Sequence, residues 1–183
     1  MRLSEEFEVL KIVTGRLDAE GIPYMVTGSM AVNYYGVPRM TRDIDVVVEL
    51  SVADLDRVCA LFRDDFYLER EAARESIERR TAFNIIHASL VVKVDFVVKK
   101  DTEYRQIEFG RRRRVSLEGH LFLIVAPEDL IISKLEWAQD THSEVQLADV
   151  RNLLRSVQEI DRLYVEQWTT RLGLGALYRE VSS

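Results

Sequence analysis

The sequence predicts a mixed α/β domain built on a short twisted sheet, followed by a helical C-terminal part. Two observations support this prediction. Apolar runs rich in β-branched residues, which are typical of buried strands, alternate with stretches of helical periodicity up to about residue 125. After that point the periodicity is helical. We therefore expect an α/β domain over residues 1–125 and helices packed on it over residues 126–183.

Length and charge restrict the class of protein. A chain of 183 residues suits one domain with a small helical appendage. The net charge of −6 argues against a general nucleic-acid coat protein, although a local basic patch stays open. The single cysteine, Cys59, excludes an intramolecular disulfide and a cysteine-rich zinc site. An acidic, amphipathic N-terminal stretch and the lack of a long apolar run predict a cytoplasmic protein that does not enter a membrane.

The first half of the chain alternates between the two kinds of element. Ser4 is a candidate N-cap for the first helix, Pro38 forces an irregular segment, and Ser51 is a further candidate N-cap. Residues 69–80 are charged throughout and suit either a solvated helix or a mobile loop. Helices are expected at 4–20, 29–35 and 51–62, and strands at 22–27, 44–50, 82–88 and 90–99.

The second half is mainly helical. Pro127 stands in the first turn of a helix whose early acids suit the helix dipole. Before it, Arg111–Arg114 follow a glycine, and we keep two interpretations: an edge strand that its charges protect from pairing, or a basic patch for an acceptor. Helices are expected at 101–109, 126–135, 145–156, 160–172 and 174–181, and a short strand at 121–125.

Asp43 and Asp45 are the first candidate site residues. Alternate residues of a strand share one face, so their Cα atoms lie about 7 Å apart with both carboxylates on the same side. Two like charges so placed need a cation, and Mg²⁺ is the usual one for oxygen ligands. Upstream, Gly28 lets backbone N–H groups approach an anion, and Ser29 offers a hydroxyl to a phosphate or a cap to the next helix.

Asp95 is the third candidate carboxylate. It interrupts the apolar run LVVKVDFVVK, where an ionised acid costs free energy unless it is paired or bound to a metal. The alternative is an exposed aspartate on the wet face of a half-buried strand, near Lys93. The acids upstream favour the functional interpretation.

One combination of residues forms a longer motif: Gly28-Ser29, then Tyr35-Gly36-Val37-Pro38-Arg39-x-Thr41-x-Asp43-Ile44-Asp45. This motif resembles the active-site signature of the DNA polymerase β-like nucleotidyltransferase superfamily, and is most similar to its bacterial minimal and abortive-infection-toxin-like branches. The resemblance implies a nucleotidyltransferase-like fold with a short mixed twisted sheet flanked by helices.

The resemblance also implies roles for particular residues. Asp43, Asp45 and Asp95 would be the catalytic and metal-binding acids. Gly28, Ser29, Arg39, Thr41 and Lys134 would bind the nucleotide.

Three further residues lie outside the central motif or have two possible roles. Lys134 and Asp149 match a lysine and an aspartate on successive helices of that branch; from the residues alone they would be a snorkelling lysine and a solvated acid. The branch often has another basic residue between the two, where this chain has Glu-Val-Gln-Leu at 144–147. Arg42 is either a structural partner of Asp43 or a supporting or acceptor-binding residue.

The leading hypothesis is an enzyme that uses Mg²⁺ or Mn²⁺ to transfer a nucleoside monophosphate from an NTP to a hydroxyl on RNA, protein or a small molecule. One alternative is a nucleotide- or partner-binding module of the same fold with little turnover, as in two-gene toxin–antitoxin pairs, where a neighbouring gene encodes the partner. Another is an antibiotic-modifying enzyme, which would need an acidic acceptor pocket.

Overall fold

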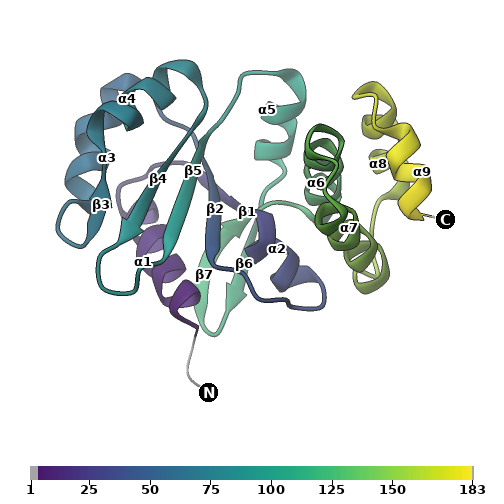
Figure 1. Cartoon of the computed structure of the whole chain (residues 1–183), viewed down its shortest axis with the longest axis horizontal. Helices are drawn as coiled ribbons and strands as arrows, with labels where there is room; N and C mark the ends of the chain where they lie inside the picture. Colours follow the sequence, from purple (N-terminus) through teal and green to yellow (C-terminus); the bar gives the residue numbers. More distant parts are fainter. Residues whose placement is uncertain (1–3, 183) are drawn as a thin grey trace.

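The computed structural model describes residues 4–182, which form one mixed sheet with helices around it (Figure 1). The seven strands of this part run in the order β3-β4-β5-β2-β1-β7-β6. They are β1 (Tyr24–Thr27), β2 (Asp43–Val48), β3 (Phe66–Leu68), β4 (Ala82–His87), β5 (Lys93–Val98), β6 (Arg113–Leu117) and β7 (His120–Ile124).

Helices lie along the sheet and at one end of it. Helices α6 to α9 gather at the right-hand end in Figure 1, with α6 and α7 nearest the sheet. The helices are α1 (Glu5–Ala19), α2 (Gly28–Tyr35), α3 (Leu55–Phe62), α4 (Arg70–Arg79), α5 (Glu103–Gly110), α6 (Pro127–Thr141), α7 (Glu144–Ser156), α8 (Arg162–Arg171) and α9 (Gly175–Ser182).

The expected mixed sheet is confirmed. β2 pairs with β5 in parallel and with β1 in antiparallel orientation, which puts β2 in the interior of the sheet. The charged segment 69–80 is a helix, α4, rather than a loop. Strand β3 was not expected, because three residues are too short for a periodic signal. The division at residue 125 stays a prediction.

Side-chain alternation gives the sheet a closed face and an open face. On the closed face Val46 and Phe96 are buried, and the ring of Phe62 from α3 packs against Phe96 with centroids 5.6 Å apart. On the open face, Asp45 and Asp95 stay partly accessible. The apolar residues that alternate with the acids therefore anchor the strands, and the acids lie on the open face.

The N-terminus of α6 is held by buried acids. Asp129 has no exposed surface, and its carboxylate accepts hydrogen bonds from Arg111 (2.8 Å) and from the hydroxyls of Tyr104 (3.2 Å) and Tyr164 (2.6 Å). Burial raises the pKa of both tyrosines, so they remain donors. This network ties α6 to α5 and α8.

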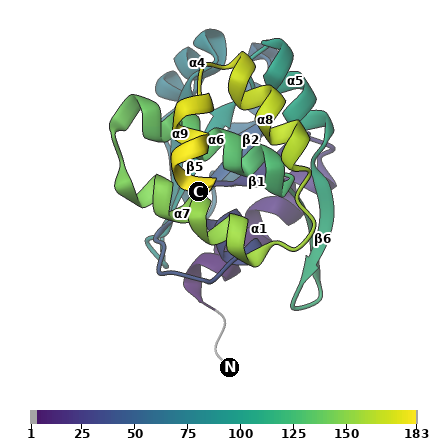
Figure 2. The ribbon, with the colours of Figure 1, turned by 90° about the vertical axis from the view of Figure 1, so that its right-hand side faces the viewer.

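The arginine run takes part in the same network. Arg111 and Arg113 alternate along the chain and both reach Glu128, at 3.2 and 3.4 Å. The guanidinium of Arg112 lies 4.2 Å from the ring centroid of Phe109. β6 is at the edge of the sheet, as the edge-strand interpretation requires (Figure 2). Three of the four arginines thus have structural contacts.

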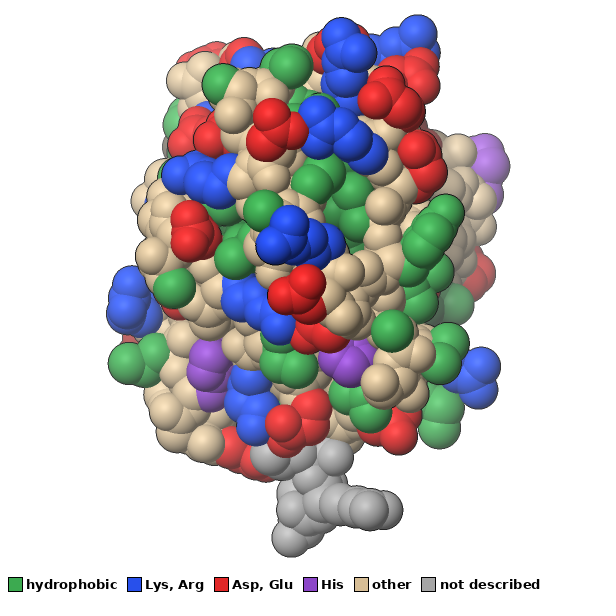
Figure 3. Space-filling model, turned by 90° about the vertical axis from the view of Figure 1, so that its left-hand side faces the viewer, with side chains coloured by type: hydrophobic (Ala, Val, Ile, Leu, Met, Phe, Trp, Pro, Cys, Tyr) green, Lys and Arg blue, Asp and Glu red, His purple; other side chains and the backbone are tan. Residues whose placement is uncertain are grey.

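The face formed by α3, α4 and β3 is not a basic surface. Figure 3 shows side chains of both charge signs interspersed there with apolar ones. Within residues 4–182, the helices lack the combination of length and apolar character that a membrane span requires.

The buried network predicts a large effect of one substitution. We expect Asp129→Ala to lower the free energy of unfolding by about 3–5 kcal/mol, because it removes the acceptor of two tyrosines and a buried partner of Arg111. Urea unfolding at neutral pH measures this. The matched control is Asp101→Ala, which breaks the exposed pair with Arg80 and should cost less than about 1 kcal/mol. Equal losses in the two variants would contradict the role of the network.

Candidate active site

Three carboxylates come together on the open face of the sheet. Asp43 and Asp45 lie on β2, and the parallel register places Asp45 directly beside Asp95 of β5. Cross-strand partners share a face, with Cβ atoms about 5 Å apart. The sequence predicted one face for Asp43 and Asp45; the pairing of the strands adds Asp95 to it.

Asp45 has an unfavourable environment for a charge. Burial, and then the neighbouring carboxylate of Asp95, raise its pKa, while Lys134 and Lys93 act in the opposite direction. An acid pair of this kind is stabilised by a cation between or beside the carboxylates.

Lys93 supplies such a cation, and sequence reasoning missed its role. Its Nζ lies 2.9 Å from Asp95 Oδ2 and 3.6 Å from Asp43 Oδ2. The hydrogen bond to Asp95 raises the pKa of Lys93. Its position two residues before Asp95 in a strand is the signal that could have revealed it.

The Gly28 turn approaches Asp45 closely. Gly28 has φ +63°, and a Cβ at this position would overlap the Asp45 carboxylate. Only glycine therefore fits at the first position of α2, directly after β1. The first turn of α2 has no acidic side chain and no side-chain cap, so its N–H groups and the Ser29 hydroxyl are available donors beside the acids.

A second cluster joins Ser29 to the C-terminal helices. The guanidinium of Arg39 donates two hydrogen bonds to Asp149, both of 2.9 Å, and one of 2.8 Å to Ser29 Oγ. Lys134 Nζ, on α6, donates at 2.9 Å to Asp149 Oδ2, the oxygen that also accepts from Arg39 Nη2. Arg39 thus brings a second positive charge to Asp149. Segment 144–147, where the resemblance led us to look for a second basic residue, contains none.

Asp149 is ionised despite being 3% exposed. Burial alone would raise its pKa, but the hydrogen bonds from Arg39 and Lys134 outweigh burial and hold the pKa below the usual aspartate value. The acid is a buried anchor rather than the solvated residue that the helix pattern alone suggested.

Two asparagines that the sequence did not single out fix the loop containing Arg39. Asn33 accepts from the Arg39 N–H (2.9 Å) and donates to the Arg39 carbonyl (2.8 Å). Asn152 of α7 makes the same pair of contacts with Val37, at 2.9 Å each. The backbone of residues 37–39 is therefore held from α2 and from α7.

Thr41 and Arg42 directly precede β2, at the edge of the candidate site. The Thr41 hydroxyl donates to the Asp43 carbonyl at 3.1 Å, which helps the chain enter β2. Arg42 is exposed, and the ion-pair partner of Asp43 is Lys93. Any contact of Thr41 or Arg42 with a substrate stays a prediction.

A divalent cation is compatible with these acids. Among residues 4–182, no three His, Cys, Asp or Glu side chains are already arranged as a set of metal ligands. Lys93 instead neutralises Asp43 and Asp95. Paired carboxylates offer the hard oxygen ligands that Mg²⁺ prefers.

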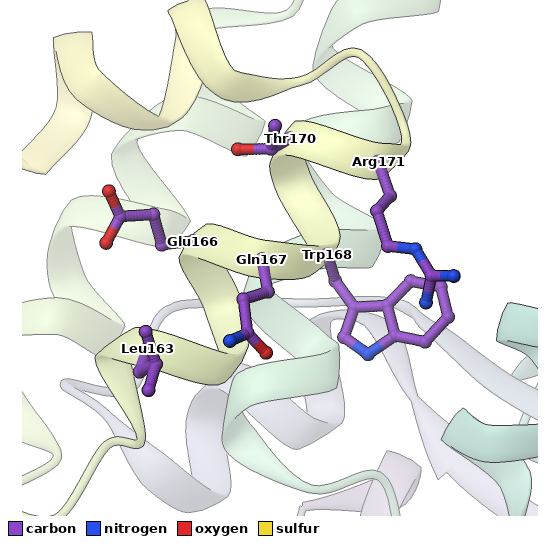
Figure 4. A pocket seen from close by; sticks show the side chains of 6 residues that line it. All are labelled: Leu163, Glu166, Gln167, Trp168, Thr170 and Arg171. Atoms are coloured by element: carbon purple, nitrogen blue, oxygen red, sulfur yellow. The ribbon is translucent and has the colours of Figure 1, made fainter.

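Two depressions on the surface of the described residues lie away from the acids. A depression of about 620 Å³ on the outer side of α8 is lined by that helix alone, with the Arg171 guanidinium lying against the Trp168 indole (Figure 4). A smaller one of about 340 Å³ lies between Val37 and α7. The acids and the Gly28 turn, by contrast, face the open side of the sheet.

Comparisons with solved structures agree on the fold. No protein-family model matches the chain, and no curated protein sequence is significantly similar to it. ANT(2″)-Ia in complex with adenylyl-2″-tobramycin is similar with a TM-score of 0.58 at 15% identity, over 97% of this chain and 98% of that one. The lincosamide antibiotic adenylyltransferase LnuA is similar with a TM-score of 0.51 at 12% identity, over 84% of this chain and 98% of that one.

A third structure is TM1012 of Thermotoga maritima, a candidate nucleotidyltransferase. It gives a TM-score of 0.56 at 17% identity, over 79% of this chain and 92% of that one. At these identities the similarity concerns the fold. The chain has the nucleotidyltransferase fold that its sequence motif implied.

The environment of Asp149 predicts a pH-dependent effect. The folded-state pKa lies below the unfolded value of about 3.9, so the stabilisation is complete above that value and is lost as the pH falls through the folded pKa. We expect Asp149→Asn to cost about 3 kcal/mol at pH 7, because Lys134 stays buried without a counter-charge, and the difference from wild type to narrow below about pH 4.

Urea unfolding at pH 7 and at a series of pH values descending from pH 4 measures both effects. The control is Asp56→Asn, which removes an acid from the exposed ion pair with Arg70. A loss for Asp149→Asn that stays the same over the whole acidic series would refute the ionised anchor.

Proposed function

We propose that the protein is a Mg²⁺-dependent nucleotidyltransferase that transfers a nucleoside monophosphate from an NTP to a hydroxyl group. The observation that carries this proposal is the register that places Asp45 beside Asp95, next to a glycine turn that contacts Asp45. Acids on neighbouring strands and an anion-binding turn are the two halves of a phosphoryl-transfer site.

Asp43, Asp45 and Asp95 are the proposed metal-binding and catalytic residues. Mg²⁺ held there would offset the negative charge of the triphosphate and of the transition state. The raised pKa of Asp45 and the nearby Lys93 indicate that these acids favour a positive charge beside them. Mn²⁺ has the same ligand preference and is a suitable substitute in assays.

The triphosphate would bind at the start of α2, where Gly28 contacts Asp45. The Gly28 and Ser29 backbone N–H groups and the Ser29 hydroxyl would donate to phosphate oxygens, as helix N-termini do. Arg39 and Lys134 would offset phosphate charge, and Asp149 holds both cations in place. Thr41 completes the proposed nucleotide-binding residues at the rim.

The proposed reaction forms one bond and breaks one. The acceptor oxygen attacks the α-phosphorus, the bond from that phosphorus to the β-phosphate oxygen breaks, and pyrophosphate leaves. Asp95, whose side chain is 25% exposed on the open face of the sheet, would take the proton from the acceptor hydroxyl. Arg42, exposed at the rim, is a candidate contact for the acceptor.

The acceptor class is RNA, a protein or a small molecule. Two of the similar structures are an antibiotic-resistance factor and an antibiotic adenylyltransferase, which keeps small molecules among the candidates. A cationic antibiotic would need free acids, however, and Glu108 of α5 and Glu136 of α6 are both paired with Arg105.

A second candidate is a nucleotide- or partner-binding module. The observation that favours it is Lys93, which already neutralises two of the acids. In this case the protein would bind a partner encoded by a neighbouring gene, as in toxin–antitoxin pairs. Stoichiometric complex formation without pyrophosphate release would favour this candidate.

The main test removes the acids. Asp43→Asn combined with Asp45→Asn should abolish labelling of any acceptor from α-labelled NTP, because the charges that hold the cation and triphosphate are lost. Pyrophosphate release, screened over the four NTPs with candidate RNAs and co-purifying proteins, identifies the acceptor first. Asp56→Asn, on the closed side of the sheet, is the control. Unchanged labelling by the double variant would contradict the proposed nucleotidyltransferase site.

A second test concerns Lys93. An ion pair of this exposure is worth about 1 kcal/mol or less, so Lys93→Met should raise Mg²⁺ affinity by up to about fivefold because it removes a competing cation. Calorimetry with MgCl₂ and no nucleotide measures the affinity, with the exposed Lys100→Met as control. Weaker Mg²⁺ binding would show that Lys93 organises the acids rather than competes for them.

A further inference from the structure

Helix α6 carries one line of residues that passes Lys134 and ends at Trp137. Its Ser133 hydroxyl donates to Glu108 of α5 at 2.6 Å, and its Lys134 donates to Asp149 of α7 at 2.9 Å. Residues three and four apart lie on one side of a helix. Trp137, which is four residues after Ser133 and three after Lys134, therefore lies between the α5 side and the α7 side, one turn further along.

The same line is buried at its start and exposed at its end. Leu130, one turn before Lys134, is 1% exposed. Lys134 is 6% exposed and acts electrostatically on Asp45. Trp137 is 60% exposed. Along this side of α6, a buried leucine is therefore followed by the proposed phosphate-binding Lys134 and then by the exposed indole of Trp137.

The two tryptophans of the chain differ in their surroundings. Trp168 is 9% exposed and packs on Tyr104, with ring centroids 5.0 Å apart. Trp137 exposes its indole one helical turn from Lys134. Aromatic side chains at such a position offer a flat surface on which a planar ring can stack, with little selectivity between bases because every base has a π-face.

We propose that Trp137 is the stacking platform for the nucleobase of the bound NTP. The proposal rests on the proposed function, because it places the triphosphate at Ser29, Arg39 and Lys134. With the phosphates there, the base extends outward along α6, where Trp137 is the next residue on the line. Recognition by stacking implies that all four NTPs bind with similar affinity.

Fluorescence of the single exposed indole tests the contact. Trp168→Phe leaves Trp137 as the only tryptophan emitter. We expect each of the four NTPs with Mg²⁺ to quench its emission on binding, and inorganic tripolyphosphate, which lacks a base, to bind without quenching. If Trp168→Phe fails to fold, the difference between wild type and Trp137→Phe gives the same signal.

Affinity gives a second readout. We expect Trp137→Ala to weaken NTP binding in calorimetry by roughly 5- to 100-fold, Trp137→Phe to retain most of it, and neither to alter tripolyphosphate binding. NTP binding without quenching, or equal losses for NTP and tripolyphosphate, would overturn the stacking role and leave the proposed function standing.

Two further outcomes separate the remaining cases. Quenching by a short oligonucleotide but by no free NTP would assign the indole to the acceptor and overturn the proposal for the NTP base. If wild type binds neither NTP nor tripolyphosphate in calorimetry, both the proposed function and the stacking role fail.

Discussion

The candidate site depends on the parallel pairing of β2 with β5. That register places Asp45 beside Asp95 with Lys93 next to Asp43, and a shift of one residue would turn each acid to the closed face. The buried residues of the closed face, such as Val46 and Phe96, oppose such a shift. Hydrophobic packing on one side of the sheet therefore fixes the spacing of charges on the other.

The C-terminal helices complete the polar part of the site. Asp149 binds Arg39 of the loop and Lys134 of α6, so one buried carboxylate joins three segments that are far apart in sequence. Asn152, on the same helix, holds the loop backbone at Val37. At its other side α6 is anchored by Asp129. Both faces of α6 therefore owe their position to buried acids with several donors each.

The sequence predicted some of these features and not others, for physical reasons. Asp43, Asp45 and Asp95 could be grouped because alternation along a strand and an acid within an apolar run are local signals. Lys134 and Asp149 came only from the resemblance, since a helix pattern does not reveal a partner on another helix. Lys93, Asn33 and Asn152 were not identified as site residues, because strand register and loop-to-helix contacts are properties of the tertiary fold.

The Gly28 contact explains why these parts form one site. Because a side chain at Gly28 would overlap Asp45, the turn and the acid are fixed relative to each other at van der Waals distance. An anion bound by the α2 N–H groups would therefore lie next to the carboxylates, where it is repelled unless a cation stands between them. Lys93 of β5 and Lys134 of α6 provide part of that positive charge. A divalent cation would provide the rest, and each of the two ligands would then reduce the charge repulsion that opposes binding of the other, which favours joint binding of metal and triphosphate.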